Sequence, residues 1–189
     1  FSSEVIESYK KSDKLNEYVL ALANTIDVLA EMTIGRIAVD PIMSLIGKEL
    51  DNFKLQAFHE NKFKTITKED LLGKWNILFF YPADFTFVCP TELEDLANKY
   101  EDFKNVNCEI YSVSTDSHFV HKAWHDASKA IKKINYPMLA DPTGKLTREL
   151  DVYIEEDGMA ERGSFIINPE GKIVMYEVIA GNVGRNADE

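Results

Sequence analysis

The sequence predicts an α/β fold in which a mixed central sheet carries helices on both faces. A separate helical segment precedes this fold in the sequence. Two observations lead to this prediction. From Asp51 onward, short apolar stretches typical of strands alternate with amphipathic stretches typical of helices. Near the end of the chain, two strand-like stretches flank a turn and add an antiparallel pair to the sheet.

The first 42 residues have a pattern of their own. Ser12 or Asp13 is suited to cap the start of a helix here, and Gly35 to end it. Apolar residues recur at three- and four-residue steps, as on one helix face, at Leu15, Tyr18, Val19, Leu22, Ile26 and Leu29. A single amphipathic helix cannot bury its own stripe, so we expect it to dock on the main body, on another subunit or on a partner. The sequence therefore predicts a helical appendage at 1–42 and a main domain at 43–189.

The main domain is predicted to begin with a hairpin. Residues 53–58 and 63–66 alternate apolar and polar side chains around the polar stretch 59–62. Residues 75–81 are almost wholly apolar, which suits a buried central strand rather than a half-exposed one. Residues 108–113 form the next predicted strand.

The remaining predicted elements are a helix at 93–103, a helix at 118–131, a short extended stretch at 136–140, one or two helical turns at 144–150, and strands at 164–167 and 173–179. Asp116 or Ser117 is suited to open the second of these helices. The last two strands flank a turn at 168–171, so we expect them to be antiparallel. The acidic stretch 155–158 is interpreted as a solvated turn.

Composition and charge exclude some classes of partner. With 45% hydrophobic and 28% charged residues, the chain of 189 residues is expected to form a packed globule. Its net charge of −11 argues against nucleic acid or an anionic membrane as the main partner. Two cysteines, Cys89 and Cys108, do not make a disulfide framework, and the start of the chain lacks the pattern of a secretory signal. We therefore expect a reducing, cytoplasmic setting.

Cys89 has the most informative surroundings in the chain. It follows an apolar strand-like run that meets Pro82, and it stands just before Pro90 and the predicted helix at 93–103. The first-turn N–H groups and the positive end of a helix stabilise a thiolate. An isolated free cysteine is more often a buried packing residue, but the neighbours of this one favour a reactive thiol.

A nucleophilic Cys89 needs help to ionise near neutral pH, because an unperturbed thiol has a pKa of roughly 8.5. A helix N-terminus and a nearby arginine both favour the thiolate. Thr86 has a hydroxyl that can donate to the sulfur or to an incoming oxygen, and Pro82 can wall the pocket. Glu92 projects to a similar side of the helix as Cys89 and would oppose a thiolate unless an arginine lay between them. Such a pocket suits a peroxide, whose attack would leave a sulfenic acid on sulfur.

The stretch from Pro82 to Glu92, PADFTFVCPTE, resembles the signature of typical two-cysteine peroxiredoxins of the bacterial alkyl hydroperoxide reductase type. The resemblance continues in the same order through residues 112–124, 141–144, 162–171 and 184–187, and it covers 43–189. It implies a thioredoxin-like fold with an N-terminal hairpin.

The resemblance also implies a function. The protein would be a thiol-dependent peroxidase that reduces hydrogen peroxide and organic hydroperoxides in antioxidant defence, without a cofactor or metal. Cys89 would be the peroxidatic cysteine, and Arg162 the arginine that orients peroxide and stabilises the thiolate. The implied partners of these two residues are Pro82 and Thr86, with Glu92 and Arg185 as a supporting acidic and basic pair. The implied protein partners are an external thiol or a flavoprotein disulfide reductase, and a second copy in a homodimer that in many members assembles into decamers.

Two features depart from that family. Its typical members carry a resolving cysteine in a C-terminal arm, whereas this chain stops at Glu189 before any such arm, and Cys108 belongs to a predicted core strand. Residues 1–42 have no counterpart in the family. We therefore expect a truncated peroxiredoxin joined to a foreign helical segment. The rival hypothesis is an assembly scaffold in which the peroxiredoxin body presents that helix to a partner.

Three other interpretations are weaker. A thioredoxin-type reductase needs two cysteines separated by two residues, but the third residue after Cys89 is Glu92. His118, His121 and His125 share a helical face as zinc ligands can, but no further ligand completes the set, so a polar face with interface roles is preferred. The stretch 142–147 lacks the upstream glycine of a phosphate loop.

Overall fold

The computed structural model describes residues 44–86, 89–180, 183–185 and 187, and the predicted appendage at 1–42 lies outside these residues. The strands are β1 (Lys54–His59), β2 (Lys62–Thr67), β3 (Trp75–Phe80), β4 (Cys108–Ser114), β5 (Met138–Ala140), β6 (Tyr153–Ile154), β7 (Met159–Ala160), β8 (Arg162–Ile167) and β9 (Ile173–Ile179). The helices are α2 (Cys89–Asn105), α3 (His118–Ala127) and α4 (Lys145–Glu149), with 3-10 turns η1 (Lys68–Leu71) and η2 (Ile131–Lys133). None of these helices is long and apolar enough to cross a membrane.

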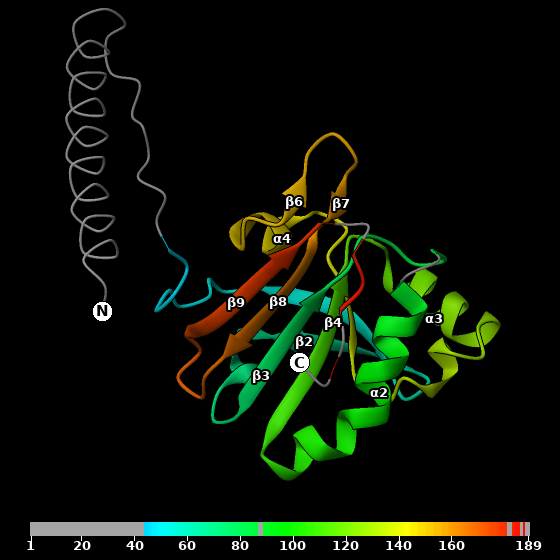
Figure 1. Cartoon of the computed structure of the whole chain (residues 1–189), viewed down its shortest axis with the longest axis horizontal. Helices are drawn as coiled ribbons and strands as arrows, with labels where there is room; N and C mark the ends of the chain where they lie inside the picture. Colours follow the sequence, from blue (N-terminus) through cyan, green and yellow to red (C-terminus); the bar gives the residue numbers. More distant parts are fainter. Residues whose placement is uncertain (1–43, 87–88, 181–182, 186, 188–189) are drawn as a thin grey trace, which may run out of the picture. The chain divides into compact units, whose positions relative to one another are not determined.

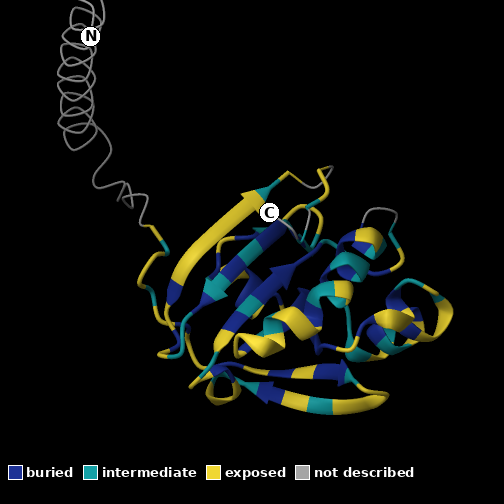
Figure 2. Cartoon of the chain, turned by 60° about the horizontal axis from the view of Figure 1, so that its bottom comes forward, coloured by how far each residue is buried: buried dark blue, intermediate teal, exposed yellow. Residues whose placement is uncertain are grey.

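The main sheet is mixed and has the strand order β2-β1-β5-β4-β3-β8-β9 (Figure 1). The predicted hairpin is confirmed, since β1 pairs with β2 in antiparallel register. The apolar strand β3 lies inside the sheet, parallel to β4 and antiparallel to β8. The predicted final pair is also antiparallel, and it leaves β9 as an exposed edge strand (Figure 2).

Both faces of the sheet are covered, as predicted. Successive side chains of a strand point to opposite faces, so Leu78 belongs to one hydrophobic cluster and its neighbour Phe79 to the other. The Phe79 cluster contains Leu93 and Leu96 of α2 and Trp124 of α3. The Leu78 cluster contains the α4 residue Leu146. The strand β3 is buried on both sides for this reason, which explains its nearly continuous apolar sequence.

The end of one predicted helix was wrong. The helix predicted at 118–131 ends at Ala127, because Ser128 is extended (φ −105°, ψ 128°) and the chain turns there so that Ile131 enters the core. Its predicted cap is confirmed, since the Ser117 side chain accepts a hydrogen bond from the N–H of Val120. The turn predicted at 155–158 is confirmed, since these residues form a largely exposed turn. It joins two short strands, β6 and β7, which were not predicted because two residues each are too few for an alternating pattern to be recognised.

Candidate active site

Cys89 is the first residue of α2, and its side chain has an exposed fraction of 0%. The helix therefore begins four residues earlier than the apolar pattern starting at Leu93 indicated. The first N–H groups of a helix have no partner within it, and its N-terminus carries a partial positive charge. The thiol of Cys89 is thus held in the part of α2 that favours an anion.

Arg162 lies between the sulfur and a carboxylate. It is the first residue of β8, the antiparallel neighbour of β3, and it is 3% exposed. Its Nη1 donates to Cys89 Sγ at 3.3 Å and also to Glu92 Oε2 in a very short contact. One guanidinium therefore separates the two groups that would otherwise repel each other when both are ionised.

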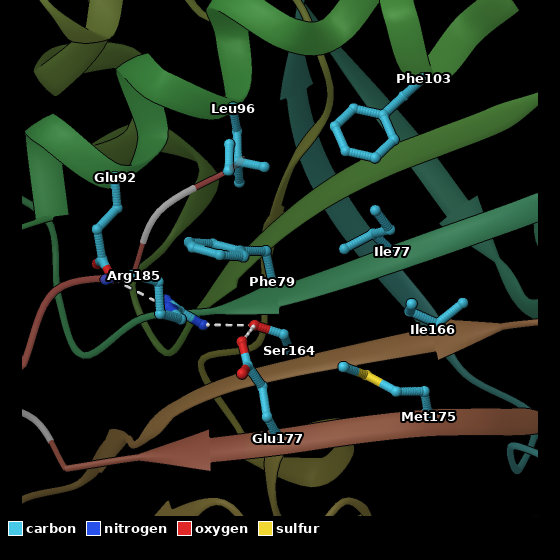
Figure 3. Close-up of a pocket in the computed structure, with 11 residues that line it drawn as sticks. Ile77, Phe79, Glu92, Leu96, Phe103, Ser164, Ile166, Met175, Glu177 and Arg185 are labelled. Atoms are coloured by element: carbon cyan, nitrogen blue, oxygen red, sulfur yellow. Dashed lines mark hydrogen bonds and ion pairs between the residues drawn. The ribbon is translucent and has the colours of Figure 1, made fainter. Parts of the chain in front are cut away.

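A second arginine holds the other oxygen of Glu92 (Figure 3). Glu92 Oε1 accepts from the backbone N–H of Arg185 at 2.8 Å and from its Nε at 3.0 Å. The same guanidinium donates to Ser164 Oγ at 3.2 Å and to the Phe80 carbonyl at 2.8 Å, and it stacks 3.4 Å above the Phe79 ring. Burial lowers the pKa of Arg185, and the hydrogen bond and charge of Glu92 oppose that shift. These contacts fix Glu92, which in turn orients Arg162.

The charges of this cluster favour an anionic sulfur. Arg162 and Arg185 are two buried guanidinium groups, and the carboxylate of Glu92 contacts both. The guanidinium of Arg162 therefore places a positive charge against Cys89 Sγ. A cation next to a cysteine favours its thiolate form.

Thr86 and Pro82 lie in the loop between β3 and α2. The Thr86 hydroxyl donates to the Ala83 carbonyl oxygen at 3.0 Å. A hydroxyl has one hydrogen, so in this arrangement Thr86 does not direct it at the sulfur, and only its oxygen lone pairs remain to accept. Pro82 is half-buried in the same loop. The structure thus brings Cys89, Glu92, Arg162 and Arg185 into direct contact, with Thr86 held by its own loop.

Sequence reasoning missed Ser164 and Phe79, which hold Arg185. Both look like ordinary strand residues, and no local signal distinguishes them. They stand opposite each other in the β3–β8 register, which brings them beside the same guanidinium. Only a correct register prediction would have found them.

The three histidines of α3 have separate environments. His118 packs against Phe119, with ring centroids 4.1 Å apart, and His125 against Phe58 at 5.0 Å. His121 is fully buried, so its interpretation as part of a polar interface face was wrong. Within the described residues, no group of three or more His, Cys, Asp or Glu side chains is arranged to hold a metal ion.

The second cysteine is chemically different from the first. Cys108 opens β4 and is buried, and neither cysteine is in a disulfide. Burial, reinforced by the negative charge of Glu109, raises the pKa of Cys108 to about 11. Cys108 is therefore protonated at neutral pH, and a protonated thiol is a poor nucleophile.

Comparison with known proteins places this site in a family. The model of the AhpC/TSA family matches residues 46–176. The chain belongs to the AhpC/TSA family. Among curated members, alkyl hydroperoxide reductase C of Bacillus subtilis (strain 168) is 54% identical over 145 residues, which are 77% of this chain and 78% of the relative. Alkyl hydroperoxide reductase C of Staphylococcus aureus (strain Mu50 / ATCC 700699) is 54% identical over 147 residues, with the same coverage of both chains.

Solved structures agree with this AhpC/TSA assignment. The crystal structure of Enterococcus faecalis AhpC matches with a TM-score of 0.77 and 55% identity, covering 77% of this chain and 87% of that one. The reduced 2-Cys peroxiredoxin of Plasmodium vivax matches with a TM-score of 0.74 and 30% identity, covering 77% and 78%. The predicted resemblance to peroxiredoxins and the predicted thioredoxin-like fold are therefore confirmed for the AhpC/TSA domain.

Proposed function

We propose that this AhpC/TSA-family protein is a thiol-dependent peroxidase that reduces hydrogen peroxide and organic hydroperoxides at Cys89. The observation that supports this most directly is the contact of 3.3 Å between Arg162 Nη1 and the Cys89 sulfur at the start of α2. It pairs the candidate nucleophile with a permanent cation in a site that excludes bulk water. The names of the relatives support the same activity.

The reaction requires one bond to form and one to break. The Cys89 thiolate attacks the nearer peroxide oxygen, an S–O bond forms, and the O–O bond breaks. The electron pair leaves with the distal oxygen, which takes a proton from solvent to give water or an alcohol, and Cys89 becomes a sulfenic acid. Donors fixed before the reaction stabilise the charge that develops on these oxygens, and we assign that role to the Arg162 guanidinium.

The remaining site residues support Cys89 and Arg162. Glu92 and Arg185 hold the guanidinium of Arg162 in place through the contacts described above. Thr86 orients the peroxide in this proposal, and Pro82 lines the approach to the sulfur. Recycling of the sulfenic acid requires an external thiol or a flavoprotein disulfide reductase. We also propose the cytoplasm as the location, in keeping with two free cysteines.

The direct test is the product on sulfur. The protein is mixed with one equivalent of hydrogen peroxide in the presence of dimedone, and peptides are analysed by mass spectrometry. We expect one dimedone adduct per chain, on the peptide that contains Cys89. An adduct confined to Cys108, or none at all, would contradict the proposal. Steady-state turnover with a small thiol, compared with a flavoprotein reductase, identifies the reductant.

A homodimer that pairs through β9 is part of the proposal. This edge strand is exposed along most of its length (Figure 2). Its exposed apolar side chains are Val174, Met175, Tyr176 and Val178. An edge strand offers unpaired N–H and C=O groups that a second copy can use, and a two-fold axis makes such pairing self-complementary. A decamer built from such dimers is the larger assembly that we propose.

We expect Val174→Lys combined with Val178→Lys to convert the dimer into a monomer. Four lysines meeting at the two-fold axis would repel and leave charge at an apolar contact, which weakens dimerisation by about 100-fold or more. Sedimentation velocity over a range of concentrations measures the change. Val106→Lys, at an exposed valine between α2 and β4, is the matched control and should remain dimeric. A double variant that still sediments as the wild type would refute pairing through β9.

The two-part organisation, 1–42 and 43–189, is proposed on the sequence pattern alone. The scaffold hypothesis also concerns residues 1–42, outside the described residues, so it stays a prediction. Deleting residues 1–42 should leave the reaction of Cys89 with peroxide unchanged.

A further inference from the structure

The loop between β3 and α2 contains a strained backbone conformation that contacts with neighbouring residues must stabilise. Phe85 has φ 58°, in the left-handed region that a bulky side chain disfavours. It stands directly before Thr86, and its ring lies 6.0 Å from that of Trp124 in α3. Such a conformation persists only when neighbouring contacts determine it.

Asp84, the residue before Phe85, is anchored by three hydrogen bonds. Its Oδ1 accepts from the Tyr81 hydroxyl at 2.7 Å, and its Oδ2 lies 2.8 Å from His121 Nδ1. Its backbone N–H donates to Asp116 Oδ2 at 2.8 Å. Burial, with the negative charge of Asp84, raises the pKa of Tyr81, so that hydroxyl keeps the hydrogen it donates. The side chains of Asp84, Tyr81 and His121 are all buried.

His121 extends this anchor to the core of the domain. Its Nε2 lies 3.0 Å from the carbonyl oxygen of Leu139 in β5. A carbonyl oxygen only accepts hydrogen bonds, so His121 Nε2 carries the hydrogen of this contact. On the other side of the ring, His121 Nδ1 and Asp84 Oδ2 share a second proton. The two side chains together are then neutral overall, which suits their complete burial. Through this pair, the loop is tied to α3 and to β5.

The anchor acts directly next to the residue that fixes Thr86. The carbonyl oxygen of Ala83 accepts the hydrogen bond of the Thr86 hydroxyl, and Ala83 directly precedes Asp84 in the sequence. A shift of Asp84 therefore moves the Ala83 peptide, and with it both Thr86 and the adjoining Pro82. We propose that Asp84 and His121 are positioning residues for peroxide reduction, which hold the strained loop so that Thr86 and Pro82 face the peroxide at Cys89. This inference rests on the proposed peroxidase function.

The test compares two substitutions of the same residue. Asp84→Ala removes both side-chain hydrogen bonds. Asp84→Asn keeps them, since an amide oxygen accepts from Tyr81 and an amide N–H donates to a neutral His121 Nδ1. Asp126→Ala, at an exposed carboxylate of α3, is the matched control. Stopped-flow measurement gives the rate constant for oxidation of Cys89 by hydrogen peroxide, and reaction with iodoacetamide gives the reactivity of the same thiol toward a reagent that needs no peroxide geometry.

We expect Asp84→Ala to slow oxidation by about 10- to 100-fold, the size expected for a small misplacement of reacting groups. Asp84→Asn should recover the rate to within about threefold, because its hydrogen bonds are retained. Alkylation should be as fast as in the wild type, or faster, in both variants. Should Asp84→Ala fail to fold, Tyr81→Phe removes one anchoring hydrogen bond at nearly constant volume, and it should slow oxidation selectively.

Three results would overturn the inference. These are an unchanged oxidation rate in the alanine variant, equal slowing of oxidation and alkylation, or an asparagine variant as slow as the alanine variant. The wild type separates this inference from the proposed function. A wild type that consumes no peroxide overturns both, whereas a reactive wild type with an equally reactive Asp84→Ala variant overturns only the positioning role.

Discussion

Replacing Cys89 by serine should abolish peroxide reduction, lowering the rate of protein-dependent peroxide consumption by at least about 1,000-fold, as removal of a catalytic nucleophile does. A serine hydroxyl is not ionised at neutral pH, and oxygen is a weaker nucleophile than sulfur toward the O–O bond. The guanidinium of Arg162, within 3.3 Å of the sulfur in the wild type, has no anion to stabilise in the variant. The measurement is loss of hydrogen peroxide with dithiothreitol as reductant.

Cys108→Ser is the matched control for this experiment. The thiol of wild-type Cys108 is buried in β4 with a pKa of about 11, so it should contribute nothing to peroxide consumption near neutral pH. We expect the control to react at the wild-type rate, within about twofold, because the thiolate is the reactive form. Normal consumption by Cys89→Ser, or loss of consumption in Cys108→Ser with the fold intact, would show that the reacting sulfur is not Cys89.

Replacing Arg162 by methionine should have the second largest effect. The variant keeps much of the apolar length of the side chain but loses the cation between Cys89 and Glu92. We expect oxidation of Cys89 to slow by about 100- to 1,000-fold, the range seen when a preorganised donor is removed.

Two further variants make the role of Arg162 specific. Arg162→Lys keeps the charge but cannot reach the sulfur and Glu92 with one planar group, so it should recover only part of the rate. Arg148→Ala removes an exposed arginine that pairs with Glu155, and it should leave the rate unchanged. Full activity in Arg162→Met would mean that the helix N-terminus alone stabilises the reacting sulfur.

The fold was predictable where the sequence pattern reports directly on burial. The apolar run of β3 predicted an internal strand, and the turn at 168–171 predicted the β8–β9 pair. The end of α3 was not predictable, because the periodicity continues past Ala127 while the chain turns to bury Ile131. Tertiary packing decided that boundary, and propensity did not.

The candidate site was predictable in composition and in part of its arrangement, because an arginine between Cys89 and Glu92 was expected and Arg162 lies there. Its six residues were expected from the resemblance, and four of them form a continuous series of contacts from Cys89 through Arg162 and Glu92 to Arg185. The sharing of Glu92 between two arginines depends on strand register and on the course of the chain near Arg185, which no local pattern reports. His121 looked like a surface residue, because its partner Asp84 is 37 positions away in the sequence.

The complete enclosure of the Cys89 sulfur has a consequence for substrate choice. An oxidant can reach the buried sulfur only after the surrounding residues move apart. The measured rate constant is then the equilibrium constant of this opening multiplied by the rate constant of the chemical step. The charged groups act on the O–O unit, which every hydroperoxide shares. Discrimination between small and bulky oxidants is therefore set by the size and the frequency of the opening that exposes Cys89.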